Sequence, residues 1–434
     1  MQSTNPTPST QLSKKEVISY GLGDLGGGLA WNAIGAFALY FYTDVALLSA
    51  ALIGTMLLVT RVLDAILDIA VGLLIDRTNS RWGKARPYML FGATPMALIF
   101  ILTFYVPNVS EQSRLIYAYI TFFSLGLVYS FVNIAYSALL PMMTTNLNEK
   151  LKLGSARSVG TSLGVILVTA LFMPVVQFFG DGDEKRGFFI TAIILALICM
   201  TMLLVTFVNC KERYAVQSEN NRPVLLSLKY LVNNRAWLAV SGFATLNFIR
   251  FGAVLALTPY FAIHVLQAPW MISILLPALS GTLLFGAFIA PPILRSLGLR
   301  KGNTLALSAS VLLYLLLPLV QENQALFIAC YLAVSLVLSI TMISIFTMAS
   351  EAVDFHEQKF GLRDEGLLSA GVGFAIKVGM AVGSAAIAYG LAYGGYQAGA
   401  VTDSARAVMT NMYYGLPIIV FALQLVCLKY YPRE

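Results

Sequence analysis

The chain has 434 residues, of which 58% are hydrophobic and only 11% are charged, whereas a soluble protein carries about a quarter charged residues. This much apolar surface cannot be buried inside a globule of this size, which excludes a soluble domain and indicates a protein covered by lipid. The formal charge of +7 does not indicate a nucleic-acid partner, because the basic residues lie in short loops between apolar runs.

Twelve apolar runs follow one another along the sequence, each long enough to cross a bilayer as a helix of about 20 residues. They cover residues 20–44, 50–75, 88–106, 114–140, 155–179, 188–210, 236–265, 271–294, 302–320, 324–349, 366–391 and 408–431. The sequence therefore predicts an all-α membrane protein with twelve transmembrane helices. The first run is long enough to remain in the membrane, so no cleavable signal peptide is expected.

The longest polar stretch between the runs divides the chain into two halves. We expect an N-terminal tail at 1–19, a six-helix bundle at 20–210, a central cytoplasmic loop at 211–235 and a second six-helix bundle at 236–434. Short basic, glycine-containing loops follow the second and the eighth run, at 72–87 and 294–302. Such matching loops suggest a six-plus-six repeat with a binding site at the midplane. The first loop also resembles the signature loop of the major facilitator superfamily.

The distribution of basic residues predicts the orientation. Of the 28 Lys and Arg residues, four lie deep inside predicted spans, and only Arg114, Lys185, Arg186 and Arg406 fall on one side of the membrane. The other twenty lie on the opposite side, which the positive-inside rule identifies as cytoplasmic. Both termini are therefore expected in the cytoplasm of a cell whose inner or plasma membrane holds the protein.

Ionisable residues inside predicted spans indicate a functional site, because each costs at least a few kcal/mol unless it is paired or hydrated. The second run carries Arg61, Asp64 and Asp68 on one helix face. The two carboxylates offer hard oxygen ligands for Na⁺, or one of them carries a proton because of its like-charged neighbour. The alternative is a structural cluster that Arg61 neutralises, although Arg61 can pair fully with only one acid.

Three further cations lie in the fifth, seventh and eleventh runs. Arg157 and Lys377 either brace helices through salt bridges or couple cation and substrate, and Arg250 lies mid-span, too deep to snorkel easily. Set against Asp64 and Asp68, these cations and Arg61 predict a positive cavity, and an arginine can bind a carboxylate through two hydrogen bonds. The pattern favours an anionic solute.

Aromatic and amide side chains add the chemistry of a sugar pocket, because sugars present both apolar faces and hydroxyls. The first run provides Trp31 and Asn32, and the fourth provides a stripe of Tyr129, Ser130, Asn133, Tyr136 and Ser137. Hydrogen bonding between helices is the alternative role of such residues. The two histidines are far apart and the four cysteines lack metal-ligand spacing, so we expect neither an enzyme nor a cofactor beyond a coupling ion.

Several motifs in order resemble the glycoside–pentoside–hexuronide:cation symporters, which include the melibiose and glucuronide permeases. They are the segments 19–24, 40–45, 61–68, 81–87, 132–141, 351–354 and 363–366, together with Lys377, and they extend over nearly the whole chain. The resemblance implies a major-facilitator-type fold, in which two six-helix bundles are related by a pseudo-two-fold axis and alternate access to the site.

The resemblance also implies roles for single residues. Asp64 and Asp68 occupy the cation-binding positions, Tyr129 and Ser130 lie near sugar or cation, Arg157 contacts the sugar and Lys377 links the two sites. Gly28 and Asn133 stand where the melibiose permease has two sugar-binding aspartates, Met342 replaces a tryptophan, and Arg250 is an addition. These departures, and an Asn-Ile-x-Tyr segment at 133–136 similar to the glucuronide permease, favour an acidic glycoside.

The sequence thus predicts a symporter that couples Na⁺ or H⁺ to a glycoside, with a hexuronide as the expected substrate. A neutral glycoside or pentoside and a lysolipid are the alternative substrates. The expected partners are a sugar, a monovalent cation and the bilayer, with no nucleic acid and a monomeric carrier. The predicted site comprises Asp64, Asp68 and Ser130 for the cation; Trp31, Asn32, Tyr129, Asn133, Tyr136, Arg157, Arg250 and Lys377 for the substrate; and Arg61, Lys377, Asp354 and Arg363 for coupling or gating.

Overall fold

The computed structural model describes residues 11–144, 146–214, 233–360 and 365–431, except for a few side chains within them. Twelve long helices follow one another in these residues, one at each predicted run, so the predicted fold class is confirmed. They are α1 (Lys14–Tyr40), α2 (Ala50–Arg77), α3 (Arg86–Thr103), α4 (Glu111–Met143), α5 (Leu147–Gly180), α6 (Glu184–Asn209), α8 (Arg235–Tyr260), α9 (Ile272–Leu297), α10 (Leu299–Leu316), α11 (Gln324–Phe360), α12 (Glu365–Tyr393) and α13 (Asp403–Tyr430).

Several helices extend beyond the apolar runs that predicted them. The helix α1 begins at Lys14 because Ser13 and Glu16 form a capping box, in which each side chain accepts a hydrogen bond from the other residue's backbone N–H. The helix α11 continues to Phe360, well past the apolar run. Apolar length therefore predicted where the membrane is crossed, but polar caps determine where each helix begins and ends.

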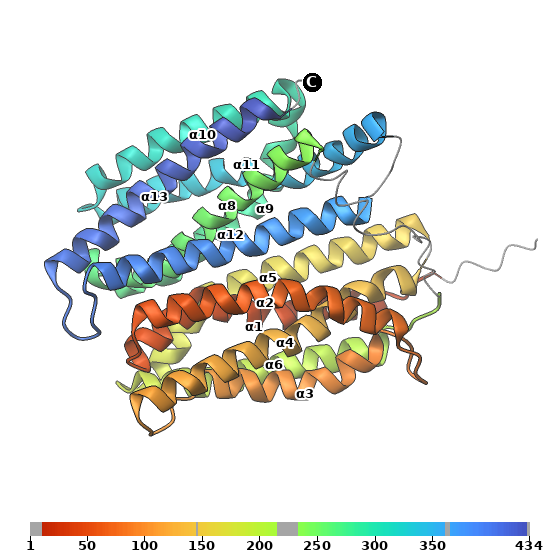
Figure 1. The fold of residues 1–434 in the computed structure, drawn as a ribbon, viewed down its shortest axis with the longest axis horizontal. Helices are drawn as coiled ribbons and strands as arrows, with labels where there is room; N and C mark the ends of the chain where they lie inside the picture. The colour runs from red at the N-terminus through yellow and green to blue at the C-terminus, as the bar shows by residue number, and fades with distance from the viewer. Residues whose placement is uncertain (1–10, 145, 215–232, 361–364, 432–434) are drawn as a thin grey trace, which may run out of the picture.

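Nine helices of the described residues are long and apolar enough to cross a membrane. The other three long helices, α1, α2 and α9, pack against them: α1 lies on α5 and α6, α2 on α4 and α12, and α9 on α5 and α11. Together the twelve form an elongated bundle in which all helices run roughly along one direction (Figure 1).

The packing partners repeat from one half to the other. In the first half α1 packs on α5, α3 on α4 and α3 on α6; in the second half α8 packs on α12, α10 on α11 and α10 on α13. The halves meet through α2 with α12, α5 with α9, and α1 with α8. In Figure 1 the first half (red to yellow-green) lies below the second (green to blue). The predicted domain boundary at 211–235 stays a prediction, because most of that segment lies outside the described residues.

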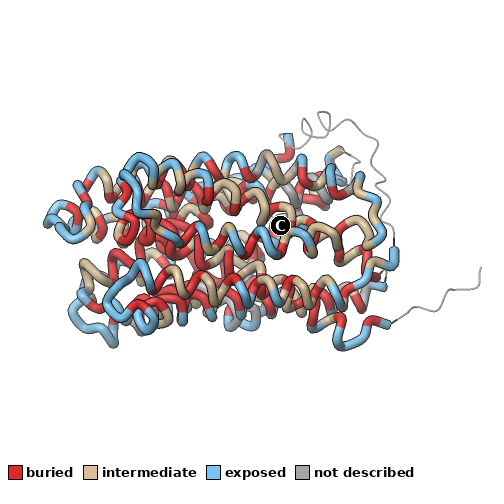
Figure 2. Tube along the Cα trace, turned by 90° about the horizontal axis from the view of Figure 1, so that it is seen from below, coloured by how far each residue is buried: buried red, intermediate tan, exposed pale blue. Residues whose placement is uncertain are grey.

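The bundle has two distinct ends. The tail end holds the first residue of α1, Lys14, and the last residue of α13, Tyr430; the far end holds the loop 394–402 between α12 and α13. The largest hydrophobic core joins residues of both halves, whereas two smaller clusters near the tail end each belong to one half. Buried residues accordingly concentrate in the interior toward the far end (Figure 2).

The loop between α2 and α3 is tied to the end of α6. Glu212 accepts hydrogen bonds from the backbone N–H groups of Lys84, Ala85 and Arg86 at 2.7–3.0 Å. Gly83 permits this approach, because its φ of +108° favours glycine and an added Cβ would lie 2.4 Å from the Glu212 carboxylate. A side-chain carboxylate therefore caps the beginning of α3, as expected for an anion at a helix N-terminus.

Candidate functional site

The two acids of α2 lie one turn apart; Asp64 is buried against α4, whereas Asp68 is partly exposed and turns to α12. Asp64 is 4% exposed, and its Oδ1 has no hydrogen-bond partner among the described residues. The carboxylate lies against Gly126 of α4, where an added Cβ would be 2.5 Å from Oδ1. Successive helices alternate in direction, so α2 and α4 run parallel, and Asp68 lies one turn beyond Asp64 at the level of the buried Ser130. Asp64 therefore faces α4 directly, and Asp68 and Ser130 lie one turn further along the same two helices.

A lysine from the other half reaches this acid pair. Lys377 of α12 forms an ion pair with Oδ2 of Asp68, while Oδ1 of Asp68 has no partner in the described part of the chain. Because α2 and α12 belong to different halves, this pair crosses the interface between them. A buried carboxylate oxygen without a partner is costly, so the acid pair is electrostatically incomplete as it stands.

Arg61 does not neutralise the acids through an ion pair; it stacks on an aromatic ring instead. Its guanidinium carbon lies 3.7 Å from the centroid of the Trp31 ring. The ring of Tyr129 also stacks on Trp31, with centroids 4.4 Å apart and planes 13° apart. Two groups this close to one ring centroid must cover its opposite faces. Trp31 is therefore held between Arg61 of α2 and Tyr129 of α4.

A cavity of about 240 Å³ adjoins this stack in the first half of the molecule. Its walls come mainly from α1, α4 and α5. Six of the eight predicted substrate residues line it, namely Trp31, Asn32, Tyr129, Asn133, Tyr136 and Arg157. Of these, Tyr136 offers its ring rather than its hydroxyl, because the hydroxyl donates to the carbonyl of Tyr20 at 2.7 Å. Rings, amides and a guanidinium facing one cavity suit a sugar.

Asp24 is the cavity residue that the sequence interpretation left outside the site. Its Oδ1 accepts a hydrogen bond from Nε of Arg157 at 3.2 Å, and its Oδ2 accepts one from the hydroxyl of Thr161. The apolar run placed Asp24 near a helix end, but α1 begins at Lys14, so Asp24 lies more than two turns inside the helix. The sequence did contain a signal for this role. Asp24 lies four residues before Gly28, which stands at a sugar-binding position of the melibiose permease, and therefore on the same helix face.

Asp24 changes the charge balance of the site. Three cations, Arg61, Arg157 and Lys377, now face three acids, Asp24, Asp64 and Asp68. The positive balance expected from the sequence is therefore not found around this cavity, and the argument it gave for an anionic solute loses its main support.

Arg250 is not brought to this cavity. It lies in the second half, is 2% exposed, and donates to the Asn247 side chain at 3.4 Å. Its Nε and Nη1 have no hydrogen-bond partner among the described residues. The cleft that Arg250 lines with Phe251 and Met342 has a volume of about 10 Å³, which is about the space of one water.

Two residues predicted to couple or gate lie elsewhere. Asp354 belongs to the part of α11 nearest the tail end, away from the cavity. Arg363 lies outside the described residues. The coupling residues that the structure does bring to the site are Arg61 and Lys377, one from each half.

Comparison with known proteins places the chain among sugar transporters. Residues 19–433 match the MFS/sugar transport protein family. The chain is 34% identical over 433 residues to YagG of Escherichia coli, a proposed glycoside/cation symporter, covering 97% of this chain and 92% of that one. It is 32% identical to the isoprimeverose transporter of Lactiplantibacillus pentosus (96% and 88% covered) and 31% identical to a glucuronide carrier protein homolog of Escherichia coli (90% and 86% covered).

Solved structures share the fold at much lower identity. A bacterial homolog of the human lysosomal transporter Spinster, inward-facing and occupied, superposes with a TM-score of 0.71 at 12% identity, covering 96% of this chain and 95% of that one. A D-xylose–proton symporter superposes with a TM-score of 0.69 at 13% identity, covering 94% and 96%.

Proposed function

The chain belongs to the glycoside/cation symporters of the MFS/sugar transport protein family, and from this premise we propose which residues carry its cation-coupled sugar symport. It is a multi-pass membrane transporter and not an enzyme. We assign the coupling cation to Asp64 and Asp68, assisted by Ser130, and the sugar to the cavity of about 240 Å³ beside Trp31.

The observation that carries the cation assignment is the incomplete acid pair. One buried oxygen of each carboxylate lacks a partner in the described residues, and the other oxygen of Asp68 is paired with Lys377. A monovalent cation between the acids would satisfy both free oxygens, and the Ser130 hydroxyl at the same level adds a third ligand. Hard cations prefer such oxygen ligands. We propose Na⁺ as this cation, since a proton would need only one carboxylate. No other cofactor enters the proposal.

For the sugar we propose a neutral glycoside. Asp24 and Arg157 form a carboxylate–guanidinium pair in the cavity wall, and together they can accept and donate hydrogen bonds to sugar hydroxyls. Asn133 adds an amide, and the rings of Tyr129 and Tyr136 offer apolar surface. A substrate carboxylate would meet the Asp24 carboxylate here, and like charges repel at this range.

A hexuronide is the second candidate, favoured by one observation in the other half. The Nε and Nη1 nitrogens of Arg250 are buried beside a small cleft next to Met342 without a hydrogen-bond partner among the described residues, and an arginine can bind a carboxylate through two such nitrogens. The similarity to a glucuronide carrier protein homolog agrees with this candidate. The cleft would have to widen when the halves approach around a sugar.

The proposal places the protein in a cell membrane as a monomer, with the tail end in the cytoplasm. The support for this orientation is the excess of Lys and Arg in the segments at that end, compared with four in the loops of the far end.

Transport by purified protein in liposomes tests the cation site. We expect Asp64→Asn and Asp68→Asn, which keep size and remove charge, to abolish the stimulation of sugar uptake by an imposed Na⁺ gradient. The matched control is Asp403→Asn, whose carboxylate is 99% exposed and pairs with the exposed Arg406. Full Na⁺ stimulation in both site variants would refute the assignment, and stimulation by a pH gradient alone would replace Na⁺ by H⁺.

The same liposomes decide between the two sugar classes. Neutral pyranosides and the corresponding uronides are compared as competitors of uptake at equal concentration. Stronger competition by the neutral member of each pair supports the first candidate. Stronger competition by the uronide supports the second and returns Arg250 to the substrate site.

A further inference from the structure

The helices α1 and α8 end in the same unusual way, at equivalent places in the two halves. Each passes at the far end into a five-residue π-helical segment, Phe41–Val45 after α1 and Phe261–Val265 after α8. Each segment is followed two residues later by a non-glycine residue with positive φ, Leu47 at 56° and Gln267 at 51°. π-Helical turns are rare and frequent at functional sites, and a positive φ is costly for a branched or long side chain.

This repeat places two different polar side chains at one equivalent position. Asp44 is the fourth residue of the first segment, and His264 is the fourth residue of the second. Both contact the same hydroxyl, that of Tyr396 in the loop between α12 and α13. Tyr396 donates to Oδ1 of Asp44, and His264 Nε2 lies 3.2 Å from the Tyr396 oxygen.

The direction of these hydrogen bonds follows from proton counting. A phenol has one hydrogen, so if it is donated to Asp44 the Tyr396 oxygen can only accept from His264, whose Nε2 must then carry the hydrogen. Burial and the adjacent Asp44 carboxylate raise the pKa of Tyr396, which keeps the phenol protonated. The result is a directed chain from His264 through Tyr396 to Asp44.

We propose that Tyr396 is the gating residue of the transport cycle, and that its bridge between Asp44 and His264, here called the latch, holds the far end of the carrier closed. Asp44 belongs to the first half, whereas Tyr396 and His264 belong to the second. These hydrogen bonds therefore cross the interface between the halves, which must separate for the far end to open. Because the acceptor is a carboxylate, the Tyr396 hydrogen bond is of the stronger, charge-assisted kind.

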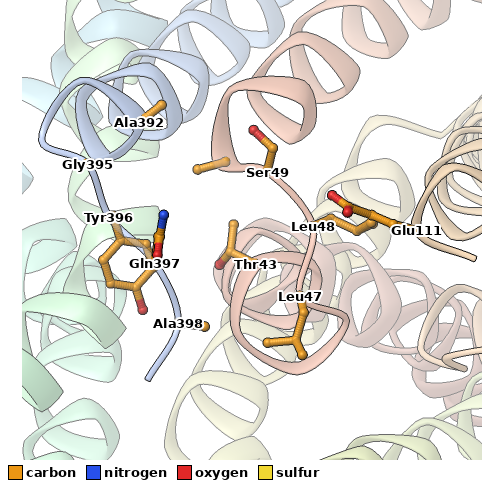
Figure 3. A pocket seen from close by; sticks show the side chains of 11 residues that line it. Thr43, Leu47, Leu48, Ser49, Glu111, Ala392, Gly395, Tyr396, Gln397 and Ala398 are labelled. Carbon is orange, nitrogen blue, oxygen red and sulfur yellow. The ribbon is translucent and has the colours of Figure 1, made fainter. Parts of the chain in front are cut away.

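Neighbouring contacts also join the two halves at the far end. The hydroxyls of Thr43 and Tyr260 lie 2.6 Å apart across the interface, and Tyr40 packs edge-on against Tyr260 at 5.8 Å. Outside this layer a cavity of about 450 Å³ separates the loop after α1 from the segment 395–398. Figure 3 shows Thr43 and Tyr396 on facing walls of that cavity, so a residue of each half in this contact layer lines it.

Charged and polar side chains from neighbouring elements surround the latch. Glu184 at the beginning of α6 accepts from the hydroxyl of Tyr40 at 3.2 Å, and Arg406 of α13 acts electrostatically on His264. Thr43 donates to the second oxygen of Asp44 at 2.6 Å. Asp44 is thus satisfied only while both the first-half and the second-half donors are in place, which makes closure cooperative.

Distance measurement between spin labels tests the latch in the full-length protein. Cysteines at Val109 and Ala400, exposed loop residues of the two halves at the far end, are labelled in a chain whose four natural cysteines are replaced. We expect Tyr396→Phe to raise the ratio of long to short distances on the order of tenfold, the effect of losing one hydrogen bond to a charged group. Tyr393→Phe, 89% exposed on the last turn of α12, is the matched control.

Two further variants separate hydrogen bonding from packing. Asp44→Asn should open the far end like Tyr396→Phe, and His264→Gln, whose amide can still donate, should stay closer to the parent than His264→Leu. If Tyr396→Phe does not fold, these variants still test whether the hydrogen bonds of the latch keep the far end closed. Unchanged distance distributions in Tyr396→Phe and Asp44→Asn would overturn the proposal. No sugar or cation gradient is needed, so this outcome is independent of the proposed substrate and cation site.

Discussion

The close contact of Asp64 with Gly126 allows the cation site to be perturbed without touching a charge. In Gly126→Ala the new methyl carbon would lie 2.5 Å from Oδ1 and 2.9 Å from Oδ2 of Asp64, whereas ordinary contacts lie at 3.4–4 Å. Asp64 is 4% exposed, so the carboxylate cannot simply turn into solvent. It must rotate away from its place on α2 or push the two helices apart.

The size of the effect follows from overpacking. Adding a methyl to a tightly packed interior costs about 1–3 kcal/mol. If the cation needs Asp64 in its present place, that cost falls mainly on the cation-bound state, which corresponds to about a 5- to 150-fold loss of cation affinity. The residues of the sugar cavity are not touched by the added methyl, so we expect sugar exchange without a cation gradient to be largely kept.

The assay is the Na⁺ concentration that half-saturates sugar uptake in proteoliposomes, for Gly126→Ala and for two control variants. Gly154→Ala in α5 and Gly415→Ala in α13 add the same methyl where nothing lies within 4 Å. An unchanged half-saturating concentration in folded Gly126→Ala, equal to that of both controls, would refute the idea that the cation binds at Asp64. A loss of sugar exchange as large as the loss of cation affinity would instead indicate general unfolding of the site.

Two predictions concern the sugar. Trp31→Ala removes the aromatic ring that lines the cavity and that the sugar would contact, a contact worth about 1–3 kcal/mol, so we expect the KM for sugar to rise about 5- to 150-fold. The control is Trp270→Ala, at a residue that is 52% exposed, and a KM unchanged from that control would contradict the role of the Trp31 ring. Arg250→Ala should reduce uptake of uronides relative to neutral glycosides on the order of tenfold. An equal loss for both classes would show that Arg250 stabilises the second half and binds no substrate.

The sequence predicts the fold well because a membrane simplifies the problem. Each crossing needs a long apolar helix, and no other element can satisfy its backbone in lipid. The twelve predicted runs therefore correspond to the twelve long helices of the described residues. The acids of α2 could also be placed on one face from their spacing alone, and the structure shows both against α4 or α12.

What could not be predicted is which distant residues meet. The sequence interpretation placed Asp24 near a helix end, because it took the helix start from apolar length rather than from the capping box at Ser13 and Glu16. The stack on Trp31 depends on three helices. The hydrogen bond between Tyr396 and Asp44 joins residues that are 352 positions apart in the chain. Such contacts depend on how each helix is rotated and shifted against its neighbours across the interface, and hydropathy carries no information on either.

The geometry suggests how the proposed cation site acts on the proposed sugar site. Arg61 and Asp64 are neighbours on one face of α2, and the Asp64 carboxylate attracts the guanidinium that covers Trp31. A cation bound at the acids would weaken that attraction and also compete with Lys377 for Asp68. Arg61 is then freer to leave Trp31, whose ring lines the sugar cavity, while the cross-half ion pair loosens.

By thermodynamic linkage the effect is reciprocal, so a sugar that displaces Arg61 from Trp31 must raise cation affinity by the same factor. The cation alone would loosen the ion pair between α2 and α12 without providing the contacts that draw the halves around a sugar. The sugar alone would leave that ion pair intact. Only with both ligands bound are the tie at Lys377 and the stack at Trp31 released together, which is the condition that symport imposes on a carrier.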